Sequence, residues 1–124
     1  MKTHPSLLLA LIGSLLLSGI RVVSAHAFLE KADPAVGSEV SQRPRQVKIW
    51  FTEKLEGALC RIQVFTAANQ EIDRHDCRVD PQNPTLLEVS LPPDLAAGTY
   101  QVVWKAVSVD THTTTGKFTF TVKG

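Results

Sequence analysis

Gln46-Val-Lys-Ile-Trp-Phe-Thr52 is a segment in which apolar and polar side chains alternate at almost every position. In an extended chain Val47, Ile49 and Phe51 point to one side, and only Trp50 interrupts the polar side, so the segment predicts a half-buried strand. The same period of two recurs four times later in the chain, in residues 59–66, 87–91, 100–106 and 118–122. These five segments predict an all-β fold.

Turn-forming residues separate the five segments, and among them are Asp80-Pro81 and Asn83-Pro84. The intervals have no sustained helical period. Short strands separated by such turns are typical of a two-sheet antiparallel β-sandwich, immunoglobulin-like or cupredoxin-like in outline. We also expect an edge strand over residues 27–31, and we expect residues 67–85 to be the longest irregular stretch.

The composition predicts one globular domain. The 124 residues contain 13 Lys and Arg against 12 Asp and Glu, and 44% of them are hydrophobic. This length and apolar content suit a single domain with a packed core. Because neither charge is in surplus, the chain lacks the basic surface that nucleic-acid binding requires, and we expect no nucleic-acid partner.

The start of the chain has the pattern of a secretory signal peptide. A basic start and an apolar run precede the small residue Ala25, which fits a cleavage site immediately before His26. A membrane anchor is the alternative, but it needs about 20 unbroken apolar residues, and Arg21 ends this run early. We therefore expect residues 1–25 to be removed on export, which leaves residues 26–124 as a mature domain without stable membrane insertion.

Cys60 and Cys77 are the two cysteines of the chain. A small secreted domain in an oxidising compartment often carries a disulfide, worth on the order of 3 kcal/mol in the chain-entropy model. The alternative is a pair of thiolate metal ligands, but the spacing matches no two-plus-two zinc arrangement. We therefore predict a Cys60–Cys77 disulfide that ties the irregular stretch to a core strand.

Cleavage before His26 would give this residue a free amine beside its imidazole. An N-terminal histidine chelates one metal ion through its amine and its Nδ1 atom together, once the amine loses its proton. The alternative is a frayed terminus that happens to begin with histidine, although the apolar residues that follow would anchor it. His26 is therefore a candidate metal ligand.

Asp110-Thr111-His112 supplies two further candidate ligands. Residues i and i+2 of an extended chain project to the same side, so Asp110 and His112 can reach one ion while Thr111 points away. The motif is short, and polar residues at the end of a strand are often simply solvated. Together with His26, the set offers one amine, two imidazoles and one carboxylate, which suits one Cu(II) ion per chain.

Other chemistry finds little support in the sequence. The G-x-S-x-G and H-E-x-x-H motifs are absent, and a blue-copper centre needs a thiolate and usually a methionine, whereas the only methionine is Met1. We therefore expect a binding protein and not an enzyme. His75 lies among charged residues and is either solvated or part of a second, weaker metal site with Asp73 or Asp76.

Five segments occur in an order that is specific when they are taken together: residues 26–29, 33–38, 47–53, 98–102 and 108–118. In this order they resemble the CopC family of periplasmic copper-binding proteins. The resemblance implies a seven-stranded Greek-key β-sandwich or barrel that binds Cu(II) through His26, Asp110 and His112. It also implies an inner-membrane copper-import partner of the CopD type. Some members carry a methionine-rich Cu(I) segment, which this chain lacks, so a Cu(II)-only member is expected.

The leading hypothesis is a monomeric periplasmic protein that sequesters or carries Cu(II) for homeostasis, resistance or import. One alternative is a copper enzyme that oxidises polysaccharides, since those enzymes also hold copper with an N-terminal histidine and a second histidine. Asp110 would occupy coordination space that such an enzyme keeps open. The other alternative is a metal-free secreted sandwich module, which predicts no copper affinity.

Overall fold

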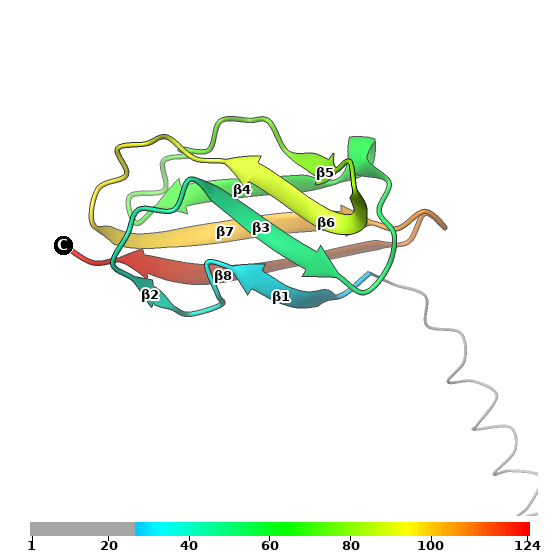
Figure 1. The fold of residues 1–124 in the computed structure, drawn as a ribbon, viewed down its shortest axis with the longest axis horizontal. Helices are drawn as coiled ribbons and strands as arrows, with labels where there is room; N and C mark the ends of the chain where they lie inside the picture. The colour runs from blue at the N-terminus through cyan, green and yellow to red at the C-terminus, as the bar shows by residue number, and fades with distance from the viewer. Residues whose placement is uncertain (1–26) are drawn as a thin grey trace, which may run out of the picture.

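The computed structural model describes residues 27–124, which fold into two β-sheets packed face to face (Figure 1). One sheet has the strand order β1-β3-β6-β5, and the other has the order β2-β8-β7-β4. All strand pairs are antiparallel except the short parallel pair of β2 with β8. The elements are β1 (Leu29–Asp33), β2 (Glu39–Val40), β3 (Gln46–Phe51), the 3₁₀ turn η2 (Gly57–Leu59), β4 (Arg61–Thr66), β5 (Arg78–Asp80), β6 (Asn83–Ser90), β7 (Gly98–Val107) and β8 (Thr113–Val122).

The predicted all-β sandwich is confirmed, with eight strands instead of seven in the described part of the chain. The strands β2 and β5 have only two and three residues, so neither is long enough to display a side-chain period. β5 lies inside the stretch 67–85 that was predicted to be irregular. Asn83 begins β6 where a turn was expected, because Asp80 and Asn83 already face each other across the β5–β6 hairpin. The edge strand β1 also begins two residues later than predicted.

The alternating residues of the five predicted segments form the core. Val47, Ile49 and Phe51 of β3 are buried, as are the matching positions of the other long strands: Ile62, Val64, Leu87, Val89, Val102, Trp104, Phe118 and Phe120. The Trp104 ring packs edge-to-face on Phe51, with 5.1 Å between ring centroids. Trp50 lies on the outer face, where Lys31 Nζ is 4.5 Å from its ring centroid. The period of two therefore separates the two faces of the sheets as predicted.

The predicted disulfide is absent from the structure, because Cys60 and Cys77 are both free and partly buried. Cys60 follows the turn η2, and its thiol forms hydrogen bonds with nearby backbone groups. The Sγ atom donates to the Glu56 carbonyl at 3.3 Å and accepts a hydrogen bond from the Val107 amide at 3.3 Å. Cys60 thus fastens η2 to the end of β7 without bonding to Cys77.

Residues 1–26 lie outside the described part of the chain, and with them the predicted signal peptide and the candidate ligand His26. Within residues 27–124, no helix is long and apolar enough to cross a bilayer.

Candidate metal centre

Asp110 and His112 lie in the turn that joins β7 to β8. The turn is closed by two backbone hydrogen bonds, from the Ser108 amide to the His112 carbonyl at 3.0 Å and from the Thr111 amide to the Ser108 carbonyl at 2.8 Å. Thr111 has a φ of 70°, which lies in the left-handed region. The chain therefore folds back on itself here, and the extended conformation expected for residues 110–112 is wrong.

The turn nevertheless brings the two candidate ligands together. His112 Nδ1 lies 3.4 Å from Asp110 Oδ2. Ligand atoms bound to one first-row divalent ion at about 2.0–2.1 Å are separated by roughly 3.0–3.4 Å, so the two donor atoms lie close to a coordinating distance. The side chains of His112 and Asp110 are 53% and 44% exposed, so an ion can reach both from solvent.

Ser108 fixes the carboxylate of Asp110. Its side chain is buried at 1% exposure, and its hydroxyl donates to Asp110 Oδ1. This hydrogen bond, aided by His112, lowers the pKa of Asp110 below its ordinary value. Asp110 is consequently held in the charged form that binds a metal ion. The sequence motif alone did not identify this supporting role of Ser108.

The first described residues are bonded to the same end of the sandwich. The Ala27 carbonyl accepts a hydrogen bond from Thr114 Oγ1, two residues after His112. Phe28 and Thr52 exchange two bonds, from the Phe28 amide to Thr52 Oγ1 at 3.0 Å and from the Thr52 amide to the Phe28 carbonyl at 2.9 Å. Figure 1 accordingly shows the start of β1 and the β7–β8 turn at one end of the molecule.

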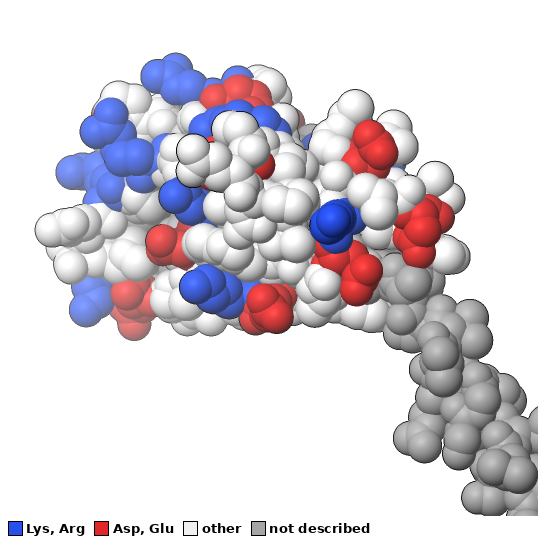
Figure 2. Space-filling view, turned by 45° about the vertical axis from the view of Figure 1, so that its right-hand side comes forward, with Lys and Arg blue, Asp and Glu red and all other residues white. Residues whose placement is uncertain are grey.

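The loop that follows β3 supports both parts of this end. Beyond the Thr52 bonds, its Lys54 carbonyl accepts from the Val109 amide at 3.1 Å, and the Glu56 amide donates to the Val107 carbonyl at 2.8 Å. The loop therefore bridges the chain start and the β7–β8 turn. Figure 2 shows acidic side chains on the right-hand side of the view, with basic side chains also present among them, while many of the Lys and Arg side chains lie toward the opposite side. Such a charge distribution favours the approach of cations.

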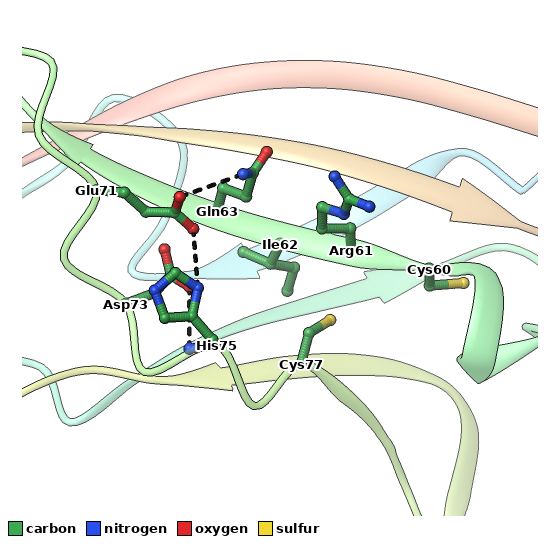
Figure 3. A pocket seen from close by; sticks show the side chains of 8 residues that line it. All are labelled: Cys60, Arg61, Ile62, Gln63, Glu71, Asp73, His75 and Cys77. Atoms are coloured by element: carbon green, nitrogen blue, oxygen red, sulfur yellow. Dashed lines mark hydrogen bonds and ion pairs between the residues drawn. The ribbon is translucent and has the colours of Figure 1, made fainter.

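His75 belongs to a second cluster, in the connection between β4 and β5. Its Nδ1 atom lies 3.3 Å from Glu71 Oε2 and 3.7 Å from Asp73 Oδ2 (Figure 3). Of the two acidic partners expected for His75, only Asp73 is beside it. Asp76 instead accepts from the Ser90 amide and forms an ion pair with Arg78 at 3.0 Å. Glu71 was not predicted as a member of this cluster, although the spacing Glu-x-Asp-x-His places three donors at alternate positions.

Comparison with known proteins identifies the family. The sequence profile of the CopC domain matches residues 29–123. The chain is 35% identical over 101 residues to Protein YobA of Escherichia coli K12, covering 82% of each protein. It is 32% identical over 107 residues to Copper resistance protein C of Pseudomonas syringae pv. tomato, covering 82% of this chain and 84% of that protein. It is also 31% identical over 98 residues to Copper transport protein CutJ of Bacillus subtilis, but that match spans 79% of this chain and only 18% of CutJ.

Solved structures agree with this assignment. The crystal structure of CopC from Methylosinus trichosporium OB3b superposes with a TM-score of 0.74 at 30% identity, covering 79% of this chain and 94% of that one. The crystal structure of PcoC, a methionine-rich copper resistance protein from Escherichia coli, gives a TM-score of 0.69 at 31% identity and covers 80% of this chain and all of PcoC. The chain therefore belongs to the CopC family of copper resistance and copper transport proteins.

Proposed function

We propose that this protein binds one Cu(II) ion in the periplasm and sequesters or carries it, with His26, Asp110 and His112 as the ligands. One observation carries the proposal. The β7–β8 turn sets Asp110 beside His112, and Thr114, two residues further on, is bonded to the Ala27 carbonyl. Ala27 directly follows His26 in the chain, which supports His26 as the third ligand.

The chemistry of the donor set favours Cu(II). An amine, two imidazoles and a carboxylate are nitrogen and oxygen donors of the kind that Cu(II) prefers in a tetragonal arrangement. Cu(I) prefers thioether and thiolate sulfur, and the only methionine of the chain is Met1. Carriage requires only reversible exchange of ligands, so no catalytic step is assigned to this centre.

The proposed ligand set depends on export. Removal of residues 1–25 as a signal peptide would convert the backbone nitrogen of His26 into an amine, which chelates copper together with the imidazole. The mature protein, residues 26–124, would then act as a monomer in the periplasm. Mass spectrometry of the secreted protein tests this step directly, since a first residue other than His26 removes the amine ligand.

A membrane copper importer of the CopD type is the proposed partner. Copper transport protein CutJ contains a segment similar to this chain as 18% of its length, so one polypeptide joins a CopC-like domain to a longer transport protein. Two exposed apolar side chains flank the proposed ligands, Phe28 at 50% exposure and Val109 at 59%. Each of them offers apolar surface close in sequence to a proposed ligand, which a partner can cover during transfer.

The test is a titration of the mature protein with Cu(II) against a competing chelator. We expect one tight equivalent, lost in both Asp110→Ala and His112→Ala, and an electron paramagnetic resonance spectrum with nitrogen ligands. His75→Asn is the matched control, because it removes a histidine elsewhere and should leave the tight equivalent unchanged. Tight binding that persists in both Asp110→Ala and His112→Ala would overturn the ligand assignment.

A further inference from the structure

The segment that carries Glu71, Asp73 and His75 crosses the open side of the sandwich. It connects β4, an edge strand of one sheet, with β5, an edge strand of the other. The Ile72 amide donates to the Val64 carbonyl of β4 at 2.9 Å, and the Arg74 amide donates to the Ser90 carbonyl at the end of β6 at 3.0 Å. Backbone bonds to both sheets therefore hold the segment in place.

The three side chains line one end of an open cleft of about 360 Å³, with Cys60 and Cys77 at its other end (Figure 3). Their donor atoms all lie within 4.8 Å of one another. The separations of His75 Nδ1 from Glu71 Oε2 and Asp73 Oδ2, 3.3 and 3.7 Å, are close to the roughly 3.3 Å between ligands of a tetrahedral ion with bonds of about 2.0–2.1 Å. The cluster is thus near the geometry that an ion needs before any ion binds.

Asp73 gives an independent reason to expect a cation here. Its side chain is only 1% exposed, and its oxygens accept from the backbone amides of Val64 at 2.8 Å and His75 at 3.2 Å. Within residues 27–124 its only ion-pair partner is His75, and Arg61, which also lines the cleft, pairs with neither Asp73 nor Glu71. Buried carboxylates in proteins are normally paired with a cation or bound to a metal.

Glu71 adds to the same imbalance of charge. Its carboxylate lies beside the same imidazole as that of Asp73, and the donor atoms of the three residues lie within 4.8 Å of one another. A bound cation would offset the repulsion between the two carboxylates. The cluster therefore gathers two acidic groups around one imidazole in a cleft that is open to ions.

We propose that Glu71, Asp73 and His75 form a second metal site, separate from the β7–β8 turn, for a borderline divalent cation such as Zn(II) or Cu(II). One imidazole with two carboxylates suits these ions, whereas Ca²⁺ and Mg²⁺ prefer ligand sets made of oxygen alone. The Cys77 thiol is not among the three clustered donor atoms.

The test uses the secreted protein carrying His112→Ala, which silences the centre at the β7–β8 turn. Zn(II) and Cu(II) are titrated separately, and retained metal is counted after gel filtration. We expect one equivalent of at least one of the two ions, and loss of that equivalent when His75→Asn or Glu71→Gln is added. Asparagine tolerates the positive φ of 59° at position 75, and glutamine keeps the shape of Glu71, so both variants should fold.

Gln70→Ala is the matched control, because Gln70 lies on the same segment and is neutral and exposed. It should leave the second equivalent unchanged. Retention of neither ion in the His112→Ala protein, or an equivalent that survives both His75→Asn and Glu71→Gln, would overturn the second site. Failure of the first centre is seen separately, as a tight Cu(II) equivalent that persists in both Asp110→Ala and His112→Ala when His75→Asn is also present.

Discussion

Gly116 lies opposite Trp104 in the β7–β8 pair, and its replacement by alanine tests how the hairpin that carries the candidate ligands packs on the core. A Cβ atom at position 116 would lie 2.4 Å from Trp104 Cζ2 and 2.6 Å from Cε2. Ordinary carbon contacts are about 3.5–4.0 Å, so the indole must move by roughly 1 Å. Trp104 is only 8% exposed and is packed against Phe51, which leaves it little room to move.

The expected cost follows from this overlap. Overpacking of a core costs about 1–3 kcal/mol, and in a domain of this size each 1 kcal/mol lowers Tm by about 4–8 °C. Gly116→Ala should therefore lower the Tm of the metal-free protein by roughly 5–20 °C. The sign of the stability change shows whether the overlap exists, because Gly116 is not in the left-handed region and alanine is not strained there for backbone reasons. Without the overlap, alanine would stabilise the strand by about 0.4–1 kcal/mol.

The assay is thermal and urea unfolding followed by tryptophan fluorescence and circular dichroism. Thr115→Ala, at the exposed neighbouring position, is the control and should change stability by no more than about 0.5 kcal/mol. Trp104→Phe should partly rescue Gly116→Ala, because the smaller ring removes the overlapping atoms, so the two changes should be non-additive. A Gly116→Ala protein as stable as the wild type, or additivity in the double variant, would refute this account of the packing.

The remaining predictions concern the metal centre and the thiols. Ser108→Ala removes the hydroxyl that donates to Asp110, and it should weaken Cu(II) binding about 10- to 100-fold in chelator competition, with Ser41→Ala as the unaffected control. Because the Ser108 bond lowers the pKa of Asp110, the stabilising effect of the ionised carboxylate is present above the ordinary carboxyl range and is lost only as pH falls through the lowered value. In Ser108→Ala the carboxyl should titrate at higher pH by NMR, and an unchanged titration would contradict the role given to Ser108. Since burial raises the pKa of Cys77 to about 11, its alkylation at pH 8 should be about a hundredfold slower than that of an ordinary thiol with a pKa of 9.0, and rapid labelling of the native protein would be the opposite result.

Much of the fold could be predicted because burial on one face leaves a period of two in the sequence. Val47, Ile49 and Phe51 illustrate this, since all three are buried at the predicted positions. The strands β2 and β5 could not be predicted in the same way, because two or three residues carry no period and these strands are defined by backbone pairing with β8 and β6. Pairing between distant segments leaves no mark on the side chains of so short a strand.

The proximity of Asp110 and His112 was predicted, but their conformation was not. Asp110 and His112 were expected to share one side of an extended strand, whereas a turn with Thr111 at a φ of 70° brings them together. A β-branched residue rarely adopts this conformation, so no propensity could indicate it. The role of Ser108 depends on its burial, which is a property of the folded chain alone.

The cysteines show how a general rule can be overridden locally. An oxidising compartment, as expected for an exported protein, would favour a disulfide, and the sequence offers one pair of cysteines, but spacing along the chain does not reveal the direction of a side chain. Cys60 is turned toward the Val107 backbone and bonds to it. The prediction therefore failed on orientation, which the sequence does not encode in any simple pattern.

The hydrogen bond between Thr114 and Ala27 joins positions 87 residues apart. A contact of such long range forms late, after most of the polypeptide between the two positions is available to fold. If the chain is exported as proposed, a molecule still emerging from the export machinery lacks its last hairpin and cannot yet assemble the proposed centre. Metal capture would then be reserved for molecules whose synthesis and translocation are nearly finished.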